Sequence, residues 1–312
     1  MRLSCHTTTG PQVVNSIQDY RNIRSAWARE DRAVGFVPTM GALHEGHITL
    51  VREAKSRCDR VVVSIFVNPA QFAPTEDLDK YPRTMESDLA LLDKEGVDVV
   101  FYPPVKEMYP SGITLDVQQQ VGTFVEVKGK SHQMEGSVRP HFFRGVATVV
   151  SKLFNIVQPT RAFFGQKDGQ QCSVIRSMVR DLFFPLELVI VPTVREADGL
   201  AMSSRNRYLS AEERAAAPVL FKALSAGEKY LRVRGPSTTA KEIIDVATET
   251  VKLEPRVQLE YFSLANPYTL EELQGPIGDD GAIFSGAVKV GKTRIIDNIL
   301  LQTNVKTWAT RD

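Results

Sequence analysis

The sequence predicts an α/β protein in which a parallel sheet with helices on both faces is followed by a smaller, mixed α/β domain. Two observations support this fold class. Short β-branched runs alternate with segments of helical period through the first 191 residues, and such alternation is typical of a parallel sheet covered by helices. Beyond residue 191 the order changes to helical segments followed by strand-like runs. We therefore expect one domain over residues 1–191 and a second, acting as a lid, over residues 192–312.

The elements of the first domain are predicted from its hydrophobic runs and their spacing. The expected strands are residues 33–37, 60–67, 97–101, 161–164 and 186–191. Between them, apolar side chains recur every three or four positions, as Val146, Val149, Val150 and Leu153 do. Residues 102–139 are rich in Gly, Gln and Ser and have no strong period, so we expect a long excursion packed over the edge of the domain.

In the second domain, helices are expected near residues 211–233 and 239–253, and strands at VQLEYFSLA, AIFSGAVKV and TRIIDNIL. Residues 286–293 also match the phosphate-loop pattern GxxxxGK[ST]. We reject that interpretation because Ala287, Val288 and Val290 suit an extended strand, which leaves Gly-Lys-Thr as the turn into the next strand. In addition, too few residues follow Thr293 for the later strand that this class of NTPase needs.

The composition indicates a near-neutral globular chain. Its 312 residues are 43% hydrophobic, which is enough for a large core and two domains. The formal net charge of +1, from 38 basic and 37 acidic side chains, gives no general attraction to nucleic acid or to an anionic membrane. We therefore expect small-molecule substrates, and any bound anion must be held locally. No apolar run approaches the ~20 residues of a membrane span.

The cysteines and the first residues bear on location. Cys5, Cys58 and Cys172 are odd in number and lie outside any CxxC pattern, so neither a disulfide framework nor a zinc cluster is indicated. This pattern favours a reducing, cytoplasmic setting. The opening MRLSCHTTTG lacks the hydrophobic segment of a secretory signal, but it is acid-free and rich in Ser and Thr. A weak organellar presequence over residues 1–10 therefore stays an open alternative.

The stretch VPTMGALHEGHITLV, residues 37–51, lies at the first strand-to-helix crossing of the predicted sheet. Gly41 and Gly46 let the backbone approach a ligand, and the helix start offers unpaired N–H groups that favour phosphate. His44 and His47 share one side of a helical turn, from which imidazole can donate to phosphate oxygens. The alternative is that the two histidines only cap the helix. A metal site is disfavoured because HEGH is one residue shorter than the zinc motif HExxH.

Two further clusters follow later strands of the same sheet. Asn68 and Gln71 bring two neutral amides to a carboxyl end of the sheet, where they could bind a hydroxyl or a carboxylate. Residues 165–171, GQKDGQQ, form another glycine-flanked loop that opens a helix. There, Lys167 offers a charge for phosphate, and Asp168 offers an acceptor for ribose hydroxyls or a helix cap. The alternatives are an ordinary turn for the amides and a mixed surface loop for residues 165–171.

The fourth cluster, residues 195–206, lies at the expected domain junction and reads READGLAMSSRN. Small hydroxyl residues beside Met202 and Arg205 favour a mobile loop that can close over a triphosphate. HxGH at the first strand end, paired with a Met-Ser-Ser-Arg loop after the sheet, resembles the signatures of the HIGH/KMSKS nucleotidylyltransferase superfamily.

Six stretches together carry a more specific resemblance. They are PTMGALHEGH, VSIFVNPAQF, HFFRGVATVVSKLFN, FFGQKDGQQ, DGLAMSSRNRYLS and RIIDNI, and over about residues 13–300 the chain is similar to the pantothenate synthetase, or pantoate–β-alanine ligase, family. The resemblance implies a Rossmann-like domain with a smaller C-terminal domain, and usually a homodimer. It implies ATP-dependent ligation of (R)-pantoate and β-alanine to pantothenate through pantoyl adenylate, with AMP and pyrophosphate released and Mg²⁺ required.

The resemblance also implies roles for individual residues. His47, with His44 and Lys167, would stabilise the charge of the reaction. The residues assigned to ATP are Met40, Gly41, His44, Gly46, His47, Gly165, Lys167, Asp168, Val194, Met202, Ser203, Ser204 and Arg205. Those assigned to pantoate and β-alanine are Gln71, Gln171 and Asn68. Asp88 is a candidate to contact magnesium indirectly. Gly169 stands where many family members carry a larger residue, which predicts a looser start of the helix.

Three other functions remain to be weighed. A related nucleotidylyltransferase would keep AMP in its product, whereas a ligase releases it. A nucleotide sensor would bind ATP without turnover, and the amide-rich substrate cluster and the paired histidines disfavour it. A tRNA synthetase is disfavoured because the chain shows no basic tRNA-binding extension.

Overall fold

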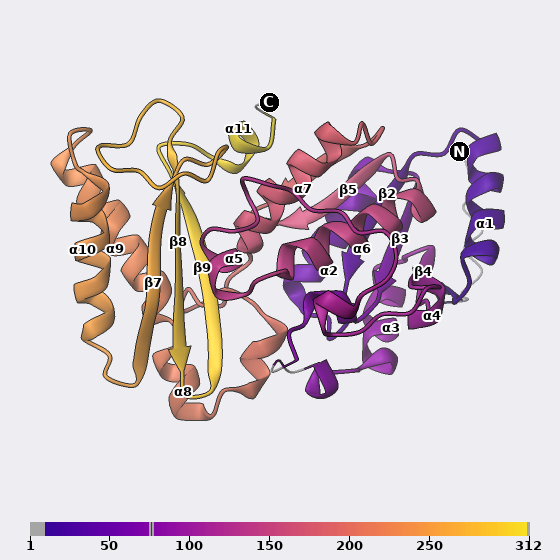
Figure 1. Cartoon of the computed structure of the whole chain (residues 1–312), viewed down its shortest axis with the longest axis horizontal. Helices are drawn as coiled ribbons and strands as arrows, with labels where there is room; N and C mark the ends of the chain where they lie inside the picture. Colours follow the sequence, from indigo (N-terminus) through magenta and orange to yellow (C-terminus); the bar gives the residue numbers. More distant parts are fainter. Residues whose placement is uncertain (1–9, 75, 77, 311–312) are drawn as a thin grey trace.

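The β-branched runs of the first domain form one parallel sheet of six strands. The computed structural model describes residues 10–74, 76 and 78–310, and Figure 1 shows the whole chain. Across the sheet the strands are β1 (Gln12–Val14), β4 (Val99–Phe101), β3 (Arg60–Ile65), β2 (Val34–Thr39), β5 (Arg161–Gly165) and β6 (Glu187–Val191). Every neighbouring pair is parallel. The five predicted strands are thus confirmed, with small shifts at their ends. β1 was not predicted, because three residues are too few to show a period.

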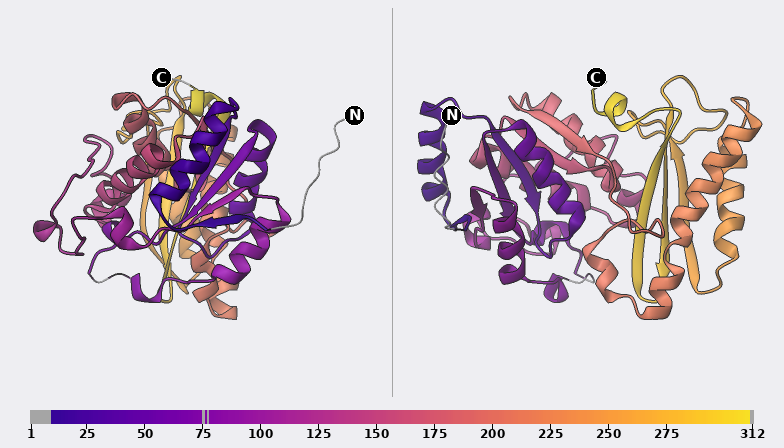
Figure 2. Two further views of the ribbon diagram at one scale, coloured as in Figure 1. Left: turned by 90° about the vertical axis from the view of Figure 1, so that its right-hand side faces the viewer. Right: turned by 180° about the vertical axis from the view of Figure 1, so that it is seen from behind.

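Helices cover both faces of this sheet, as predicted. The five long ones are α1 (Ile17–Arg29), α2 (Glu45–Arg57), α3 (Met85–Lys94), α6 (Phe142–Val157) and α7 (Gly169–Asp181). Residues of α1, α6 and α7 share one hydrophobic core with the sheet, and residues of α2 and α3 share a second core. The two cores therefore lie on opposite faces, and Figure 2 shows the helices stacked on both sides of the strands.

The C-terminal part forms a separate antiparallel sheet in the order β7 (Val257–Ala265), β8 (Ala282–Val290) and β9 (Thr293–Leu301). Helices α9 (Val219–Arg234) and α10 (Ala240–Lys252) pack on it through a third hydrophobic core. The single helix predicted over 211–233 is two helices, α8 (Ala211–Ala216) and α9, because Pro218 follows α8 and begins the next. The sheet of the first domain and this smaller sheet lie side by side in Figures 1 and 2.

The phosphate-loop pattern at residues 286–293 is part of a β-hairpin. Residues 286–290 belong to β8, where Ala287 and Val288 are buried, and Thr293 begins β9. Gly291 has a φ of 58°, which fits the tight turn between the two strands. The interpretation as a strand and turn is therefore confirmed, and this segment makes no phosphate cradle.

The excursion and the end of the chain link the two parts. Residues 102–139 include the short helices α4 (Val105–Met108), η3 (Val117–Gln119) and α5 (Glu135–Val138), and the Glu135 carboxylate pairs with Arg294 of β9 at 2.6 Å. Helix α11 (Val305–Thr310) returns to the first domain, where the fully buried Trp308 joins its core. The remaining short helices are η1 (Pro69–Gln71), η2 (Leu78–Lys80), η4 (Gln166–Asp168) and η5 (Ser204–Tyr208).

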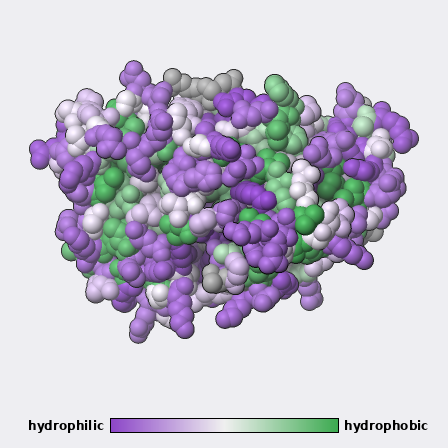
Figure 3. Space-filling model, in the orientation of Figure 1, coloured by the Kyte–Doolittle hydropathy of each residue, from purple (hydrophilic) through white to green (hydrophobic). Residues whose placement is uncertain are grey.

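The surface agrees with the composition. In Figure 3, hydrophilic residues cover most of the face seen in Figure 1, and hydrophobic residues show between them in separate patches. Within the described residues, no helix combines the length and the apolar character that a membrane span needs. Residues 1–9 of the opening segment, for which a presequence was an alternative, lie outside the described residues.

Candidate active site

A pocket of about 240 Å³ opens at the carboxyl ends of β2 and β5, where the strand order of the parallel sheet reverses. Such a point is where ligands bind in open α/β sheets. The pocket brings together nearly every residue that the sequence analysis assigned to a substrate. These are Met40, His44, Gly46, His47, Asn68, Gln71, Gly165, Lys167, Asp168, Gln171, Val194, Met202, Ser203, Ser204 and Arg205. Gly41 and Asp88 instead line a neighbouring cavity.

His44 and His47 begin α2 and cap it reciprocally. Nδ1 of His44 accepts a hydrogen bond from the backbone N–H of Gly46 at 3.2 Å, and Nδ1 of His47 accepts one from the N–H of His44 at 3.3 Å. The two histidines therefore do cap the helix, and this capping leaves their Nε2 atoms available for a ligand. Because each Nδ1 is an acceptor, each neutral ring carries its proton on Nε2 and can donate from there.

The protonation state of the two histidines follows from their surroundings. Burial, followed by the cations of Lys167 and Arg207, lowers the pKa of His44 to about 4. Burial lowers the pKa of His47 to about 3, and His44, Lys167 and Arg207 add to this shift. Both imidazoles are thus neutral near pH 7 when no anion is bound. They are suited to donate N–H hydrogen bonds to a ligand rather than to carry a positive charge.

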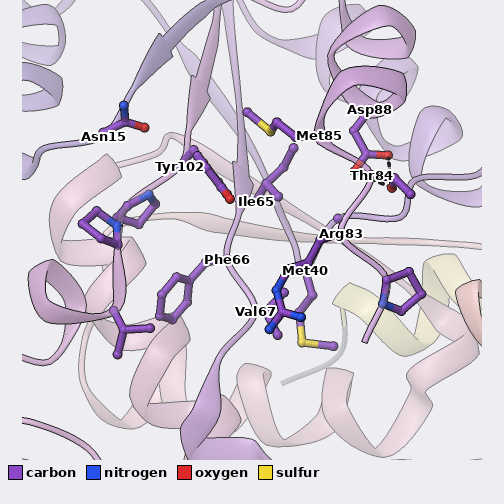
Figure 4. A pocket seen from close by; sticks show the side chains of 15 residues that line it. Asn15, Met40, Ile65, Phe66, Val67, Arg83, Thr84, Met85, Asp88 and Tyr102 are labelled. Carbon is purple, nitrogen blue, oxygen red and sulfur yellow. Dashed lines mark hydrogen bonds between the residues drawn. The ribbon is translucent and has the colours of Figure 1, made fainter. Parts of the chain in front are cut away.

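Asp88 holds the loop before these histidines. Its two carboxylate oxygens accept hydrogen bonds from the backbone N–H groups of Ala42 and Leu43, each at 2.9 Å, and from the Thr84 hydroxyl at 3.1 and 3.2 Å. Figure 4 shows Asp88 beside Thr84 at the edge of the neighbouring cavity. The side chain is 1% exposed and already has these partners. The structure therefore gives Asp88 a role in fixing the loop and offers no support for the magnesium contact that the resemblance suggested.

The two amides after β3 form a pair. Asn68 is buried, and its Nδ2 donates to Oε1 of Gln71 at 3.0 Å and to the carbonyl of Gly145 at 3.2 Å. Its Oδ1 accepts a hydrogen bond from the Tyr109 hydroxyl at 2.6 Å. Asn68 is thus engaged within the protein and orients Gln71. The Nε2 of Gln71 makes a 3.4 Å contact with the sulfur of Met40, a weak acceptor, so it can turn to a ligand.

The loop after β5 is held by the C-terminal sheet. Nδ2 of Asn298, on β9, donates to the carbonyls of Gln166 and Lys167 at 2.9 and 2.8 Å. At the start of α7, a Cβ added to Gly169 would lie 2.5 Å from Cδ1 of Ile283 on β8. This close packing gives another reason for a small residue here than the loose helix start that was expected. Gly169 is buried, and its lack of a side chain allows the two domains to approach closely there.

The loop at residues 195–206 is docked on the first domain. The Ser204 hydroxyl donates to the carbonyl of Ala42 at 3.0 Å, and Arg207 donates to the carbonyl of Leu43 at 3.3 Å. The Met202 N–H donates to the carbonyl of Val194 at 3.0 Å. This loop thus forms one side of the pocket, next to the helix start that carries the histidines.

The sequence analysis missed part of the pocket lining. The missed residues include Thr39, Phe66, Tyr81, Val146, Val149, Val150, Leu153, Phe163, Phe164 and Thr193. The apolar spacing of the α6 residues was interpreted as core packing alone, and they do pack in the core while also forming a wall of the pocket. The sequence does not show that α6 lies beside the carboxyl ends of the strands, so its part in the pocket was missed.

A second cavity of about 500 Å³ adjoins the pocket at the ends of β3 and β4. Met40 and Phe66 line both spaces. Figure 4 shows Met40, Arg83 and Val67 among the side chains that line this cavity, together with Asn15 and Tyr102. Its lining is mainly apolar, and among the described residues Arg83 is its one basic side chain.

The donor set does not form a protein cage for a metal ion. Asp168 is the one carboxylate among the described residues that line the pocket, and the part of the chain that the structure describes contains no group of three or more His, Cys, Asp or Glu placed to hold an ion. Mg²⁺ is commonly held by one or two carboxylates and by substrate phosphates. These residues alone therefore do not fit a resident magnesium site.

Known proteins are similar to this chain in sequence and in fold. The family model for pantoate-beta-alanine ligase matches residues 12–300. A pantothenate synthetase of Herpetosiphon aurantiacus is 51% identical over 290 residues, which cover 93% of this chain and 100% of the relative.

Two solved structures extend the comparison. The crystal structure of pantothenate synthetase from Thermus thermophilus has a TM-score of 0.83 and 46% identity, and the match covers 92% of this chain and 98% of that one. The pantoate-beta-alanine ligase of Francisella tularensis, complexed with beta-gamma ATP and beta-alanine, has a TM-score of 0.73 and 31% identity, over 95% and 99% of the two chains. The chain therefore belongs to the pantoate-beta-alanine ligase family, enzymes that join pantoate and β-alanine to make pantothenate.

Proposed function

We propose that this site first joins pantoate to AMP, using ATP, and then transfers the pantoyl group to β-alanine. The observation that carries the proposal is the convergence of His44, His47 and Lys167 in one pocket with Ser203. Neutral N–H donors, one cation and a hydroxyl suit the oxygens of a triphosphate. The Francisella relative, which was solved in complex with beta-gamma ATP and beta-alanine, supports the same substrates here.

The chemistry explains why these groups are needed. A carboxylate is a poor electrophile, because its negative charge repels an incoming amine. In the first step a carboxylate oxygen of pantoate attacks the α-phosphorus of ATP, the bond to the β-phosphate oxygen breaks, and pyrophosphate leaves. Negative charge builds on the leaving oxygens, where Nε2–H of His47 and the Lys167 ammonium can stabilise it. The products of this step are pantoyl adenylate and pyrophosphate.

In the second step the free amine of β-alanine attacks the acyl carbon of the adenylate. The bond between that carbon and the AMP oxygen breaks, the amine loses a proton, and pantothenate and AMP are released. The cavity of Figure 4 meets the pocket at Met40 and Phe66, which leaves an approach for the amine that the nucleotide does not fill. Apolar surroundings also keep water from the reactive anhydride.

We assign pantoate to the inner part of the pocket. The apolar wall of Val146, Val149 and Leu153 suits its two methyl groups, and the amides of Gln71 and Gln171 suit its hydroxyls. We infer that Mg²⁺ arrives bound to the phosphates of ATP, since the described pocket lining offers only Asp168 as a carboxylate. No step above depends on it.

The proposal extends to the organisation of the enzyme. Residues 192–312 would act as a lid over the nucleotide, because Met202, Ser203 and Ser204 reach the pocket from that part. We further propose a homodimer, as the resemblance implied, in the cytoplasm, as the unpaired cysteines favour.

The decisive experiment is exchange of labelled pyrophosphate into ATP with pantoate present and β-alanine absent. We expect exchange, because the adenylate forms before the amine is needed. Exchange that requires β-alanine would indicate a concerted route instead. Product analysis of the complete reaction separates the ligase, which releases free AMP, from a nucleotidylyltransferase, which keeps AMP in its product.

A further inference from the structure

Two polar residues are buried in the C-terminal sheet and do not belong to the pocket lining. Asp297 and Asn298 are neighbours on β9, and their side chains are 4% and 3% exposed. They belong to the stretch RIIDNI, to which neither the sequence analysis nor the proposed reaction gives a role. A buried carboxylate and a buried amide are costly unless their hydrogen bonds are satisfied, so the partners of these two side chains indicate what they do.

The Asn298 amide is satisfied by the loop after β5. Both hydrogens on its Nδ2 point to backbone carbonyls, that of Gln166 at 2.9 Å and that of Lys167 at 2.8 Å. Its Oδ1 accepts a longer bond from Nε2 of Gln166 at 3.4 Å. One neutral amide therefore fixes two successive carbonyls, a task that needs two donors on one atom. One of those carbonyls belongs to Lys167, which lines the pocket.

Asp297 fixes Asn298 in turn. Its Oδ1 accepts the backbone N–H of Asn298 at 2.8 Å, and its two oxygens pair with the guanidinium of Arg195 at 2.5 and 3.0 Å. Arg195 also donates to the carbonyls of Asn298 and Gly199, at 3.3 and 3.1 Å. The Arg195 guanidinium lies 3.9 Å from the centre of the Phe221 ring, which holds it from the other side. The strand, the loop after β5 and the start of residues 195–206 thus share one hydrogen-bonded unit.

We propose that Asn298 is a positioning residue that sets the place of Lys167 in the nucleotide site, with Asp297 and Arg195 holding Asn298 in turn. The inference rests on the proposed function in one respect, namely that Lys167 binds the phosphates. It predicts that ATP affinity depends on where the C-terminal sheet lies, because β9 supplies the contact. Asn298 acts through Lys167 and not through a contact of its own with the substrates.

A contact that only stabilises the fold would give a different result from the one proposed for Asn298. The Glu135–Arg294 ion pair also joins the two parts of the chain, but it links α5 to β9, and Glu135 reaches the start of α7 through the Gln170 side chain and not through the carbonyls of Gln166 and Lys167. Loss of a contact of that kind lowers the stability of the fold as a whole. Loss of the Asn298 contact should act on ATP binding through one defined residue, and coupling between two residues can be measured by a double-mutant cycle.

The test replaces the donor with an acceptor of the same shape. Asn298→Asp places an oxygen against the carbonyls of Gln166 and Lys167, so both bonds are lost and the loop shifts. We expect the Kd for ATP, measured by calorimetry without pantoate, to rise by about 10-fold to 100-fold, the scale of losing a buried hydrogen bond near a charge. Lys167→Ala should also raise it. In the double variant the rise should be little larger than that of Lys167→Ala alone, because Asn298 acts through Lys167.

A matched control is Asn266→Asp in the same C-terminal part. Asn266 also donates through Nδ2 to a protein oxygen, that of Asp280 at 3.0 Å, and its Oδ1 accepts from the backbone of Tyr268 and Thr269, outside the pocket loops. We expect the Kd of this variant for ATP to match that of the wild type.

Far-ultraviolet circular dichroism and a thermal melt check the fold of each variant. If Asn298→Asp does not fold, Asn298→Ser, which keeps one donor, takes its place in the cycle and should raise the Kd by a smaller factor.

The outcomes separate this inference from the proposed function. Additive effects of the two substitutions on the Kd, or an unchanged Kd in a folded Asn298 variant, would overturn the positioning role. If the wild type binds ATP but shows no pantoate-dependent pyrophosphate exchange, the proposed reaction is overturned. The double-mutant cycle, which measures only ATP binding, would still test the role of Asn298.

Discussion

The two strand-to-helix crossings that form the proposed nucleotide site are built in different ways. One leads from β2 into α2, the other from β5 into α7, and β2 and β5 are neighbours in the sheet. The first crossing is held mainly by its own domain, through the reciprocal caps of His44 and His47 and through Asp88 of α3. The second is held by Asn298, which lies 131 residues after Lys167 along the chain.

This difference teaches how the two halves of the site depend on the rest of the fold. A capping pair at positions three residues apart forms as soon as the helix forms, since all its atoms belong to one turn. The carbonyls of Gln166 and Lys167 receive their partner only when the small sheet has docked. The caps of the histidine half are therefore local, although Ser204 and Arg207 also bind its loop. The lysine half is completed by the other domain.

The largest effect is expected from His47→Ala, which tests whether the histidine half carries the chemistry. Loss of one donor to the developing charge should lower the single-turnover rate of adenylation by about 10²–10³. The substitution also removes one hydrogen bond of the capping box, which should cost about 1 kcal/mol in the free energy of unfolding. His47→Asn is the matched variant, since its shorter side chain can still accept at the helix start without reaching a phosphate. It should recover stability but not rate, and a wild-type rate in His47→Ala would remove His47 from the mechanism.

The next effect concerns Gln171, on the half that the other domain completes. Gln171→Ala should raise the Kd for pantoate by about 5-fold to 150-fold, the scale of losing about 1–3 kcal/mol when one partner of a hydrogen bond is removed. The Kd for ATP, measured on the same preparation, should hardly change. Selectivity against analogues that lack the bonded hydroxyl should fall as well. Equal affinity for pantoate in the variant and the wild type would contradict the assignment of Gln171 to pantoate binding.

Asp88→Asn tests whether the first crossing depends on α3. An amide presents a donor to the N–H of Ala42 or Leu43, so the free energy of unfolding should fall by about 1–3 kcal/mol in a urea titration. Asp93→Asn, an exposed position on the same helix, is the control and should change stability little. The concentration of Mg²⁺ needed for half-maximal activity should be the same in both. A higher requirement in Asp88→Asn alone would restore the metal contact.

The smallest effect is expected from Gly169→Ala, at a close approach of the two domains. The new Cβ would meet Cδ1 of Ile283 at 2.5 Å and Nδ2 of Asn298 at 3.2 Å, but the Ile283 methyl group is the flexible end of a side chain. Crowding should slightly outweigh the gain from helix propensity, for a net loss of about 1 kcal/mol in the free energy of unfolding. Adding Ile283→Val, which removes the methyl group, should restore stability. Tighter pantoate binding in Gly169→Ala would support the interpretation of a loose helix start.

The same contrast explains what the sequence could predict. The parallel sheet, its crossings and the pocket residues of the first half follow from local patterns, because glycines, histidines and strand ends lie within a few residues of one another. The amides and the Met-Ser-Ser-Arg loop were placed by resemblance and by the rule that parallel strands end at one edge. Each of these segments does reach the pocket.

What the sequence could not predict depends on contacts between distant segments. Nothing near Asn298 signals that its amide binds two carbonyls of another domain, and nothing near Asp88 signals that it caps a loop 45 residues earlier. The close packing at Gly169 could not be predicted for the same reason, since its neighbour Ile283 comes from the other sheet. The lining of α6 was missed because a side chain that packs in a core and one that faces a ligand have the same spacing.

The end of the described chain has a mechanical consequence for the proposed lid. The C-terminal part leaves the first domain after β6, and α11 brings the chain back to it, with Trp308 buried in the first core. The indole N–H of Trp308 donates to the carbonyl of Pro267, in the C-terminal part itself, at 2.8 Å, so α11 is bound to both parts. We infer that the proposed lid cannot open by rotation about its linker alone, because any opening must also shift or release α11.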